Sequence, residues 1–241
     1  MKLGKFGLLE VLLIAGIIIS IVFALFFHFK NTEQQRTDDW IRSIASGKES
    51  NWEKISEQGE ISEDHERVSI LTPEKAEIPK DPADRKIDFA ALLEVNSDII
   101  AWLFIPGTDI EYPVFCAPEG MDEDYYLRRD INGKYNPHGC IYARKSEMNE
   151  DGSITMIYGH NMRDGTMFGS LTDVDSGELF LYTPTAARVY VFEMEEIRNP
   201  EELYPAGDSY DLTLCTCTRD GSRRYLKHYT LSPSTSSDPF K

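Results

Sequence analysis

Eight short runs of strand-forming residues between positions 99 and 231 constrain most strongly what this chain can fold into. Turn-forming pairs such as Pro106-Gly107 and Asp220-Gly221 separate most of the runs, and little helix-forming sequence lies between them. A set of short antiparallel strands leaves no exposed edge when it closes on itself. We therefore predict a mainly β fold, a closed eight-stranded barrel with short helices. The runs are residues 99–105, 110–116, 139–142, 154–158, 179–183, 188–193, 212–218 and 225–231.

The N-terminus carries a charge-free apolar stretch from Val11 to Phe27. Together with the apolar residues before it, the stretch reaches the roughly 20 residues that cross a bilayer. Lysines precede it, and no small-residue cleavage site follows it. The sequence predicts an uncleaved signal-anchor over residues 1–30, a transmembrane helix that contacts the membrane through residues 6–29. A short tail before a large domain favours a single-pass protein with its folded domain on the extracellular face of the cell membrane.

Residues 31–87 are polar and acid-biased, and they separate the apolar stretch from the predicted barrel. Apolar residues from Trp40 to Ile55 recur at near-helical spacing, which predicts a weakly amphipathic helix. Prolines without any periodicity follow, and this pattern is typical of a linker. We therefore predict a membrane anchor at 1–30, a polar helix and linker region at 31–87, and a β-barrel domain at 88–241 that opens with a short helix at 89–95.

Charge and cysteine content narrow the function. The formal net charge is −16 and the isoelectric point is near 4.7, which argues against a nucleic-acid partner because phosphate binding needs a basic surface. The four cysteines form neither a CxxC pair nor a cluster with histidine at metal-ligand spacing. We expect no structural zinc site. Cys116 and Cys140 are best interpreted as buried small hydrophobic side chains.

Two segments carry the residues best suited to chemistry. In the first, an apolar run ends at Gly159, which lets the backbone turn so that His160 projects from the strand end. In the second, the two-residue period of a strand places Cys215 and Cys217 on one face, and Arg223-Arg224 follows on the next turn and strand. A thiol needs a nearby base or cation to form thiolate, and acyl transfer needs a donor for the oxyanion. One cysteine, one histidine and one arginine on neighbouring strand ends can supply both.

These segments resemble a known family. TLCTC (residues 213–217) with a downstream arginine resembles the TLxTC signature of sortases, in which the terminal cysteine is the nucleophile. YGHNMRDGTMFGSL (residues 158–171) is similar to the catalytic-histidine segment of class B sortases. The resemblance extends through IAWLFIPGTDIEYPV (residues 100–114) and DEDYYLRRDINGKYNPHGCIY (residues 122–142). It covers about residues 88–231 and implies a sortase-type β-barrel.

The resemblance implies a role for each matching position. Cys217 is implied as the nucleophile and His160 as the general acid. Arg224 is implied as the group that binds the substrate carbonyl or the oxyanion, with Arg223 as the alternative. Cys215 is either an isostere of the serine often found at its position or one half of a redox-sensitive pair with Cys217. The residues implied to line the substrate groove are Cys215, Thr216 and Leu127.

One segment departs from the family pattern. Class B sortases carry a long insert with a helix before the nucleophile strand. Here the corresponding segment, EEIRNPEELYPAGDSYD (residues 195–211), has room for a helical turn or two at most. Because that insert contributes to substrate recognition in the family, the sequence leaves the preferred motif open.

The activity implied by the resemblance is transpeptidation, with no metal and no organic cofactor. The enzyme is expected to cleave a C-terminal sorting motif, LPxTG-like or NPxTx-like, in a secreted protein through a thioacyl intermediate on Cys217. It then transfers the acyl group to an amine of a lipid-linked peptidoglycan precursor or a pilin, in a Gram-positive-type envelope. Three alternatives remain open from the residues: a membrane-anchored cysteine endopeptidase, a catalytically silent binding domain, and a thiol–disulfide sensor.

Overall fold

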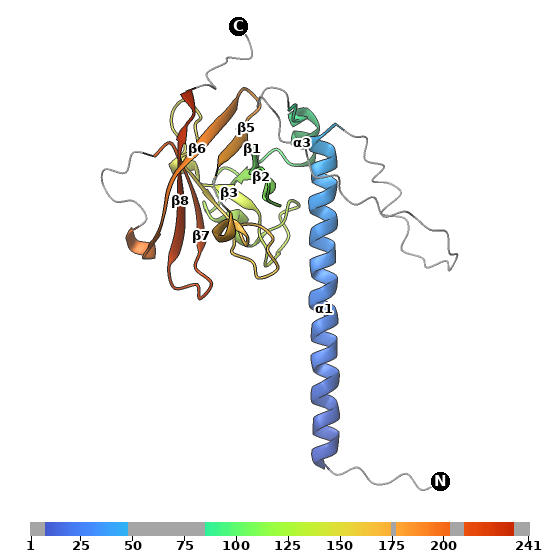
Figure 1. Ribbon diagram of the computed structural model, residues 1–241. Coiled ribbons are helices and arrows are strands. Elements are labelled where there is room, and N and C mark those ends of the chain that lie inside the picture. The colour runs from blue at the N-terminus through green and yellow to red at the C-terminus, as the bar shows by residue number, and fades with distance from the viewer. Residues whose placement is uncertain (1–7, 48–84, 175–176, 203–209, 234–241) are drawn as a thin grey trace. The chain divides into compact units, whose positions relative to one another are not determined.

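The computed structural model describes residues 8–47, 85–174, 177–202 and 210–233 (Figure 1). The chain divides into two compact units, residues 1–40 and residues 41–241. The first unit consists of most of α1 (Leu8–Ala45), which continues without a break through residue 30. Within the described residues no helix has both the length and the apolarity that a membrane crossing requires, so the predicted transmembrane helix is not confirmed. Trp52, Ile55 and all of the predicted linker before residue 85 lie outside the described residues.

The second unit begins with the last turn of α1, where Ile41 and Ala45 are buried. Arg42 donates hydrogen bonds to the backbone carbonyls of Asp109 and Glu111, both at 3.2 Å. The short helix predicted at residues 89–95 is present as α3 (Phe89–Val95). It begins there because the Asp88 carboxylate accepts a hydrogen bond from the Ala91 amide at 3.0 Å, which satisfies a donor of the first turn.

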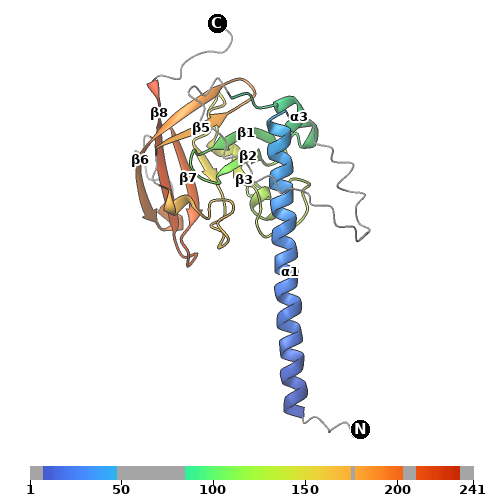
Figure 2. The same cartoon turned by 45° about the vertical axis from the view of Figure 1, so that its right-hand side comes forward.

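The predicted closed barrel of eight strands is confirmed (Figures 1 and 2). Its spatial order is β1-β2-β3-β4-β7-β8-β6-β5, so that β5 returns to pair with β1. Short 3-10 turns lie in the connections, among them η2 (Tyr125–Arg128), η3 (Lys145–Glu147), η4 (Leu171–Asp173) and η5 (Pro200–Glu202). The strands are β1 (Ile99–Phe104), β2 (Glu111–Cys116), β3 (Ile141–Ala143), β4 (Met156–Tyr158), β5 (Glu178–Tyr182), β6 (Ala187–Arg198), β7 (Leu212–Cys217) and β8 (Arg224–Leu231).

The barrel is not wholly antiparallel, and in this respect the prediction from sequence is wrong. β2 pairs with β3 and β4 pairs with β7 in parallel, while the other pairings are antiparallel. A parallel pair of consecutive strands needs a long crossover connection. Residues 117–140, which include η2, supply that crossover between β2 and β3. Because β4 and β7 are parallel, their C-terminal ends lie at the same end of the barrel.

The alternating strand pattern fills the barrel. Leu212 and Leu214 of β7 and Tyr225 and Tyr229 of β8 belong to the buried core. Between the two tyrosines, Lys227 is fully buried. Its ammonium donates to the carbonyls of Leu171 at 3.1 Å and Val174 at 2.7 Å, which lie at the end of the connection from β4 to β5. Alternation therefore turns the odd-numbered residues of β7, including both cysteines, to the opposite face of the strand.

Candidate functional site

Cys217 and Arg224 face each other across the β7–β8 hairpin. Cys217 is the last residue of β7, Arg224 is the first of β8, and the strand register pairs them directly. Directly opposed residues of an antiparallel pair have Cβ atoms about 4.5–5.5 Å apart and share one face. Arg223, by contrast, is exposed in the turn. The register therefore puts Arg224, rather than Arg223, beside the thiol.

His160 reaches the same end of the barrel because β4 runs parallel to β7. Tyr158 is paired with Cys215, so the residues just after β4 lie beside the end of β7. The Gly159 amide donates to the Cys215 carbonyl at 3.2 Å, and the Thr216 hydroxyl donates to the Gly159 carbonyl at 2.7 Å. Gly159 is closely packed, since a Cβ there would lie 2.4 Å from Ile141 Cδ1 and 2.8 Å from Phe168 Cδ2, so both side chains would have to move. This close packing fixes where the chain turns into His160.

Asn161 connects the two halves of the site and was not among the site residues predicted from the sequence. Its side-chain amide donates to the backbone carbonyl of Cys217 at 2.8 Å. Arg219, two residues after Cys217, makes a second connection: its guanidinium donates to the carbonyls of Met162 at 3.2 Å and Gly169 at 3.0 Å. The one signal for Asn161 in the sequence was its position directly after His160. A hydrogen-bond donor next to a residue at the site also lies close to the site.

The His160 imidazole is more buried than exposed and is held by a backbone carbonyl. Its Nε2 lies 2.7 Å from the carbonyl oxygen of Leu127 in η2. Burial lowers the pKa of His160, the hydrogen bond to Leu127 opposes that shift, and the positive charges of Arg128 and His138 lower the pKa further. The neutral imidazole is therefore favoured at neutral pH.

The predicted groove residues differ in how much surface they offer. Cys215 is 1% exposed, and burial raises its thiol pKa to about 12, with the nearby Arg224 acting in the opposite direction. Thr216 is 2% exposed and uses its hydroxyl inside the fold. The side chain of Leu127 is partly exposed. Cys215 and Thr216 thus lie beneath the surface next to Cys217, and a substrate would reach Leu127 more easily than either of them.

None of the four cysteines, all of which lie in the described part of the chain, forms a disulfide. Because a raised pKa keeps the Cys215 thiol protonated at neutral pH, it is a poor partner in thiol–disulfide exchange, which proceeds through thiolate. The isostere interpretation of Cys215 therefore accounts for it better than the redox-sensitive pair. No group of His, Cys, Asp and Glu side chains in the described parts of the chain could hold a metal ion.

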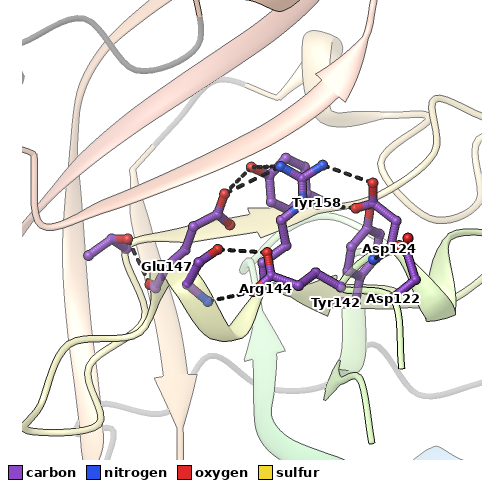
Figure 3. Close-up of polar contacts among 9 residues, drawn as sticks. Asp122, Asp124, Tyr142, Arg144, Glu147 and Tyr158 are labelled. Carbon is purple, nitrogen blue, oxygen red and sulfur yellow. Dashed lines mark hydrogen bonds and ion pairs between the residues drawn. The ribbon is translucent and has the colours of Figure 1, made fainter. Parts of the chain in front are cut away.

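A polar network lies on β3, β4 and their connections (Figure 3), and it neighbours Cys215 because the strand register pairs Tyr158 with that cysteine. Arg144 forms a two-pronged ion pair with Asp124, with nitrogen–oxygen distances of 2.8 and 3.0 Å, and its guanidinium lies 4.6 Å above the Tyr158 ring. The Tyr142 hydroxyl also donates to Asp124, at 2.8 Å. On the other side, the Tyr158 hydroxyl donates to Glu147. The network therefore holds both tyrosines, which stack on each other, in one arrangement.

The two carboxyls of this network have opposite pKa shifts. Burial raises the pKa of Asp124, but hydrogen bonds from Arg144 and Tyr142 and the positive charges of Arg144 and Arg224 together lower it. Burial dominates at Glu147 and raises its pKa. The Arg224 contribution shows that Asp124 lies within electrostatic range of the residue beside Cys217. The network could not be predicted from the sequence, because its members come from two strands, β3 and β4, and from the two connections that precede them.

The fold and the site define a class of protein: closed eight-stranded barrels in which a strand-end cysteine has an arginine across a hairpin and a histidine after a parallel neighbour. The model of the Sortase domain matches residues 103–231, more than half of the chain. The chain therefore belongs to the sortase family, and the family resemblance found in its sequence is confirmed.

Individual relatives are named sortase B. The chain is 32% identical to Sortase B of Listeria monocytogenes over 133 residues, 52% of this chain and 53% of that protein. It is 33% identical to Sortase B of Staphylococcus aureus over 86 residues, 35% of this chain and 34% of that protein. The chain thus spans about half or less of the curated relatives it matches. In fold it resembles the Staphylococcus aureus sortase B–substrate complex, with a TM-score of 0.51, 17% identity, and coverage of 62% of this chain and 85% of that one.

Proposed function

We propose that this protein is a cysteine transpeptidase that forms a thioacyl intermediate on Cys217. Three observations support the proposal: membership of the sortase family, the register that pairs Cys217 with Arg224, and the parallel strands that bring His160 to the same end. The register carries most weight. It places a thiol and a planar cationic donor on the same face of the β7–β8 hairpin, and acyl transfer uses such a nucleophile together with a donor for the oxyanion.

The reaction has two steps, formation of a thioester on Cys217 and transfer of the acyl group to an amine. The Cys217 thiol gives its proton to His160, and the thiolate attacks the carbonyl carbon of a threonine in the sorting motif while Arg224 donates to the oxyanion. The carbon–nitrogen bond breaks, His160 protonates the departing amine, and a thioester remains. An acceptor amine then attacks the thioester, forms a new amide bond and loses a proton through His160, which restores the thiol.

The substrate and its location belong to the same proposal. The substrate class is a secreted protein with a C-terminal sorting motif, LPxTG-like or NPxTx-like. The acceptor is an amine of a lipid-linked peptidoglycan precursor or a pilin. The reaction is placed on the extracellular face of the cell membrane in a Gram-positive-type envelope. The support for that location is the apolar sequence from Val11 to Phe27, and protease accessibility in intact cells tests it.

The test uses the full-length protein with quenched peptides carrying each motif, with and without an oligoglycine acceptor, and identifies products by mass spectrometry. We expect a ligated product that is lost in Cys217→Ala and in His160→Ala. Cys116→Ala is the matched control, because it removes another partly buried thiol, and it should retain activity. Hydrolysis that the acceptor does not alter would replace the proposal with an endopeptidase. No turnover of any peptide would favour a silent binding domain.

A further inference from the structure

His160 is held by a group that can only accept a hydrogen bond. The Leu127 carbonyl oxygen lies 2.7 Å from Nε2, so Nε2 must carry the hydrogen of this contact. In neutral imidazole the other nitrogen, Nδ1, then has no hydrogen. We propose that the Leu127 carbonyl fixes this tautomer so that Nδ1 exchanges protons in the reaction, and that Gly139 is the positioning residue that makes the contact possible. This inference rests on the proposed function of His160.

The backbone around Leu127 explains why its carbonyl is available. The carbonyl of Tyr126 accepts from the Cys140 amide at 3.0 Å, and the carbonyl of Arg128 accepts from the Asn136 amide at 3.0 Å. Both neighbouring carbonyls are thus used by residues 136–140, while the carbonyl between them is directed to His160. The ring of Tyr126 fixes η2 further, because its hydroxyl donates to the Asp98 carboxylate at 2.6 Å.

Gly139 is packed directly against this carbonyl. Its φ of +59° lies in the left-handed region that favours glycine. A Cβ at this position would lie 2.3 Å from the Leu127 oxygen and 2.8 Å from the Tyr126 oxygen, and both contacts are with backbone. Any side chain here would therefore displace the carbonyl that holds His160. Gly139 does not touch the reacting atoms and acts through the position of Leu127.

Proton transfer through Nδ1 keeps the hydrogen bond between Nε2 and Leu127. When the thiol proton reaches Nδ1, the imidazolium carries a hydrogen on each nitrogen, and the Nε2 hydrogen remains bonded to Leu127. Delivery of the Nδ1 proton to the leaving amine restores the starting tautomer. Transfer from Nε2 would instead break the bond to Leu127 in every cycle. The Leu127 carbonyl thus orients the histidine as a carboxylate does in other nucleophile–histidine sites.

The charged neighbours of His160 set the conditions for a test. Arg128, which follows Leu127 in η2, and His138, which precedes Gly139, both affect His160 electrostatically. His138 is itself 3.3 Å from the Asp164 carboxylate. Measurements therefore have to report on His160 separately from His138, and His160→Gln and His138→Gln supply that assignment.

The experiment is nitrogen NMR of the full-length protein with labelled histidine, together with kinetics of peptide transfer. We expect His160 to show a protonated Nε2 and an unprotonated Nδ1 at neutral pH. Gly139→Ala should mix the tautomers and lower kcat by about tenfold or more, with little change in KM. Gly120→Ala is the control, because its φ of +81° adds similar strain in the same connection but a Cβ there meets no atom within 4 Å.

The possible outcomes separate cleanly. A protonated Nδ1 in the resting protein would overturn the inference whatever the activity. So would a Gly139→Ala variant that keeps the wild-type tautomer and the kcat of Gly120→Ala. If Gly139→Ala does not fold, the tautomer of the unmodified protein still decides. Loss of transpeptidation with every substrate, despite the expected tautomer, would count against the proposed function and leave the Leu127 contact intact.

Discussion

The histidine half and the cysteine–arginine half of the site are built differently. His160 leaves a strand whose end is fixed by Gly159, its ring is held by the Leu127 carbonyl, and the following loop is held by Lys227 and Arg219. Across the site, Cys217 and Arg224 lie on either side of the turn of the β7–β8 hairpin, and this turn is exposed. The Arg224 guanidinium has a long hydrogen bond of 3.4 Å to the carbonyl of its neighbour Arg223.

The difference fits the separate tasks that we propose for the two halves. A group that transfers protons gains from a fixed ring, since the orientation then need not be found in each cycle. A group that binds a developing oxyanion has to be open to the substrate, and a long local bond is easily exchanged for a stronger one. Asn161 spans the two halves through its bond to the Cys217 carbonyl.

The largest effect is expected in the open half, at Arg224. Arg224→Ala removes the donor opposite Cys217 and should lower kcat about 10²–10³-fold, the usual cost of losing an oxyanion donor. Arg224→Lys should recover part of this loss, because lysine keeps the charge without the planar fork. Arg223→Ala should stay within about twofold of the unmodified protein. Steady-state kinetics of peptide transfer would show the opposite assignment if Arg223 were the donor.

The fixed half should be weakened most by removing its buried lysine. Lys227→Met has similar length but leaves the carbonyls of Leu171 and Val174 without their donor. We expect the free energy of unfolding to fall by about 1–3 kcal/mol. The exposed Lys134→Met should change it by less than about 0.5 kcal/mol. Denaturant titration measures both, and equal stability of the two variants would show that the loop after His160 does not depend on Lys227.

The connection between the halves is tested by Asn161→Ala. Losing one hydrogen bond to the Cys217 carbonyl is expected to cost about 1 kcal/mol, which corresponds to roughly a fivefold fall in kcat. KM should change little, because the peptide contacts remain. Asn132→Ala removes an exposed side chain from the connection between β2 and β3 and controls for the loss of an amide. If Asn161→Ala changes thermal stability but not kcat, the bond is structural only.

Much of the barrel could be predicted because its signals are local. Turn residues and alternating apolar positions located the eight strands, and the placement of Cys215 and Cys217 on one face followed from the same period. The direction of strand pairing could not be predicted, because side chains alternate between the two faces in the same way in parallel and antiparallel pairs. β6 was also predicted too short: it continues past Glu193 to Arg198. Its charged second half pairs with β8 at the surface, where polar residues are tolerated.

The candidate site could be predicted less completely than the barrel, for a related reason. Cys217, His160 and Arg224 could be proposed from their residue types together with the family resemblance. The choice between Arg224 and Arg223 needed the register of the hairpin, which no single strand encodes. The hold on His160 comes from a backbone carbonyl, and a carbonyl is common to all residues. Its one trace in the sequence is Gly139, whose meaning appears only when its distance to Leu127 is known.

The smallest expected effect is in the fixed half, where His160 should make the free energy of unfolding depend on pH. Because the pKa of His160 is lower in the folded protein than the unperturbed value of about 6.5, the unfolded chain binds more protons in this range. His160 therefore contributes fully to stability above the unfolded pKa and loses that contribution as pH falls below it. His160→Gln has no such dependence. The difference in unfolding free energy between the two proteins should shrink from pH 7.5 to pH 5, as measured by denaturant titration. A constant difference would mean that the His160 ring is as open to solvent as the arginine opposite Cys217, and the contrast between the two halves would then not hold.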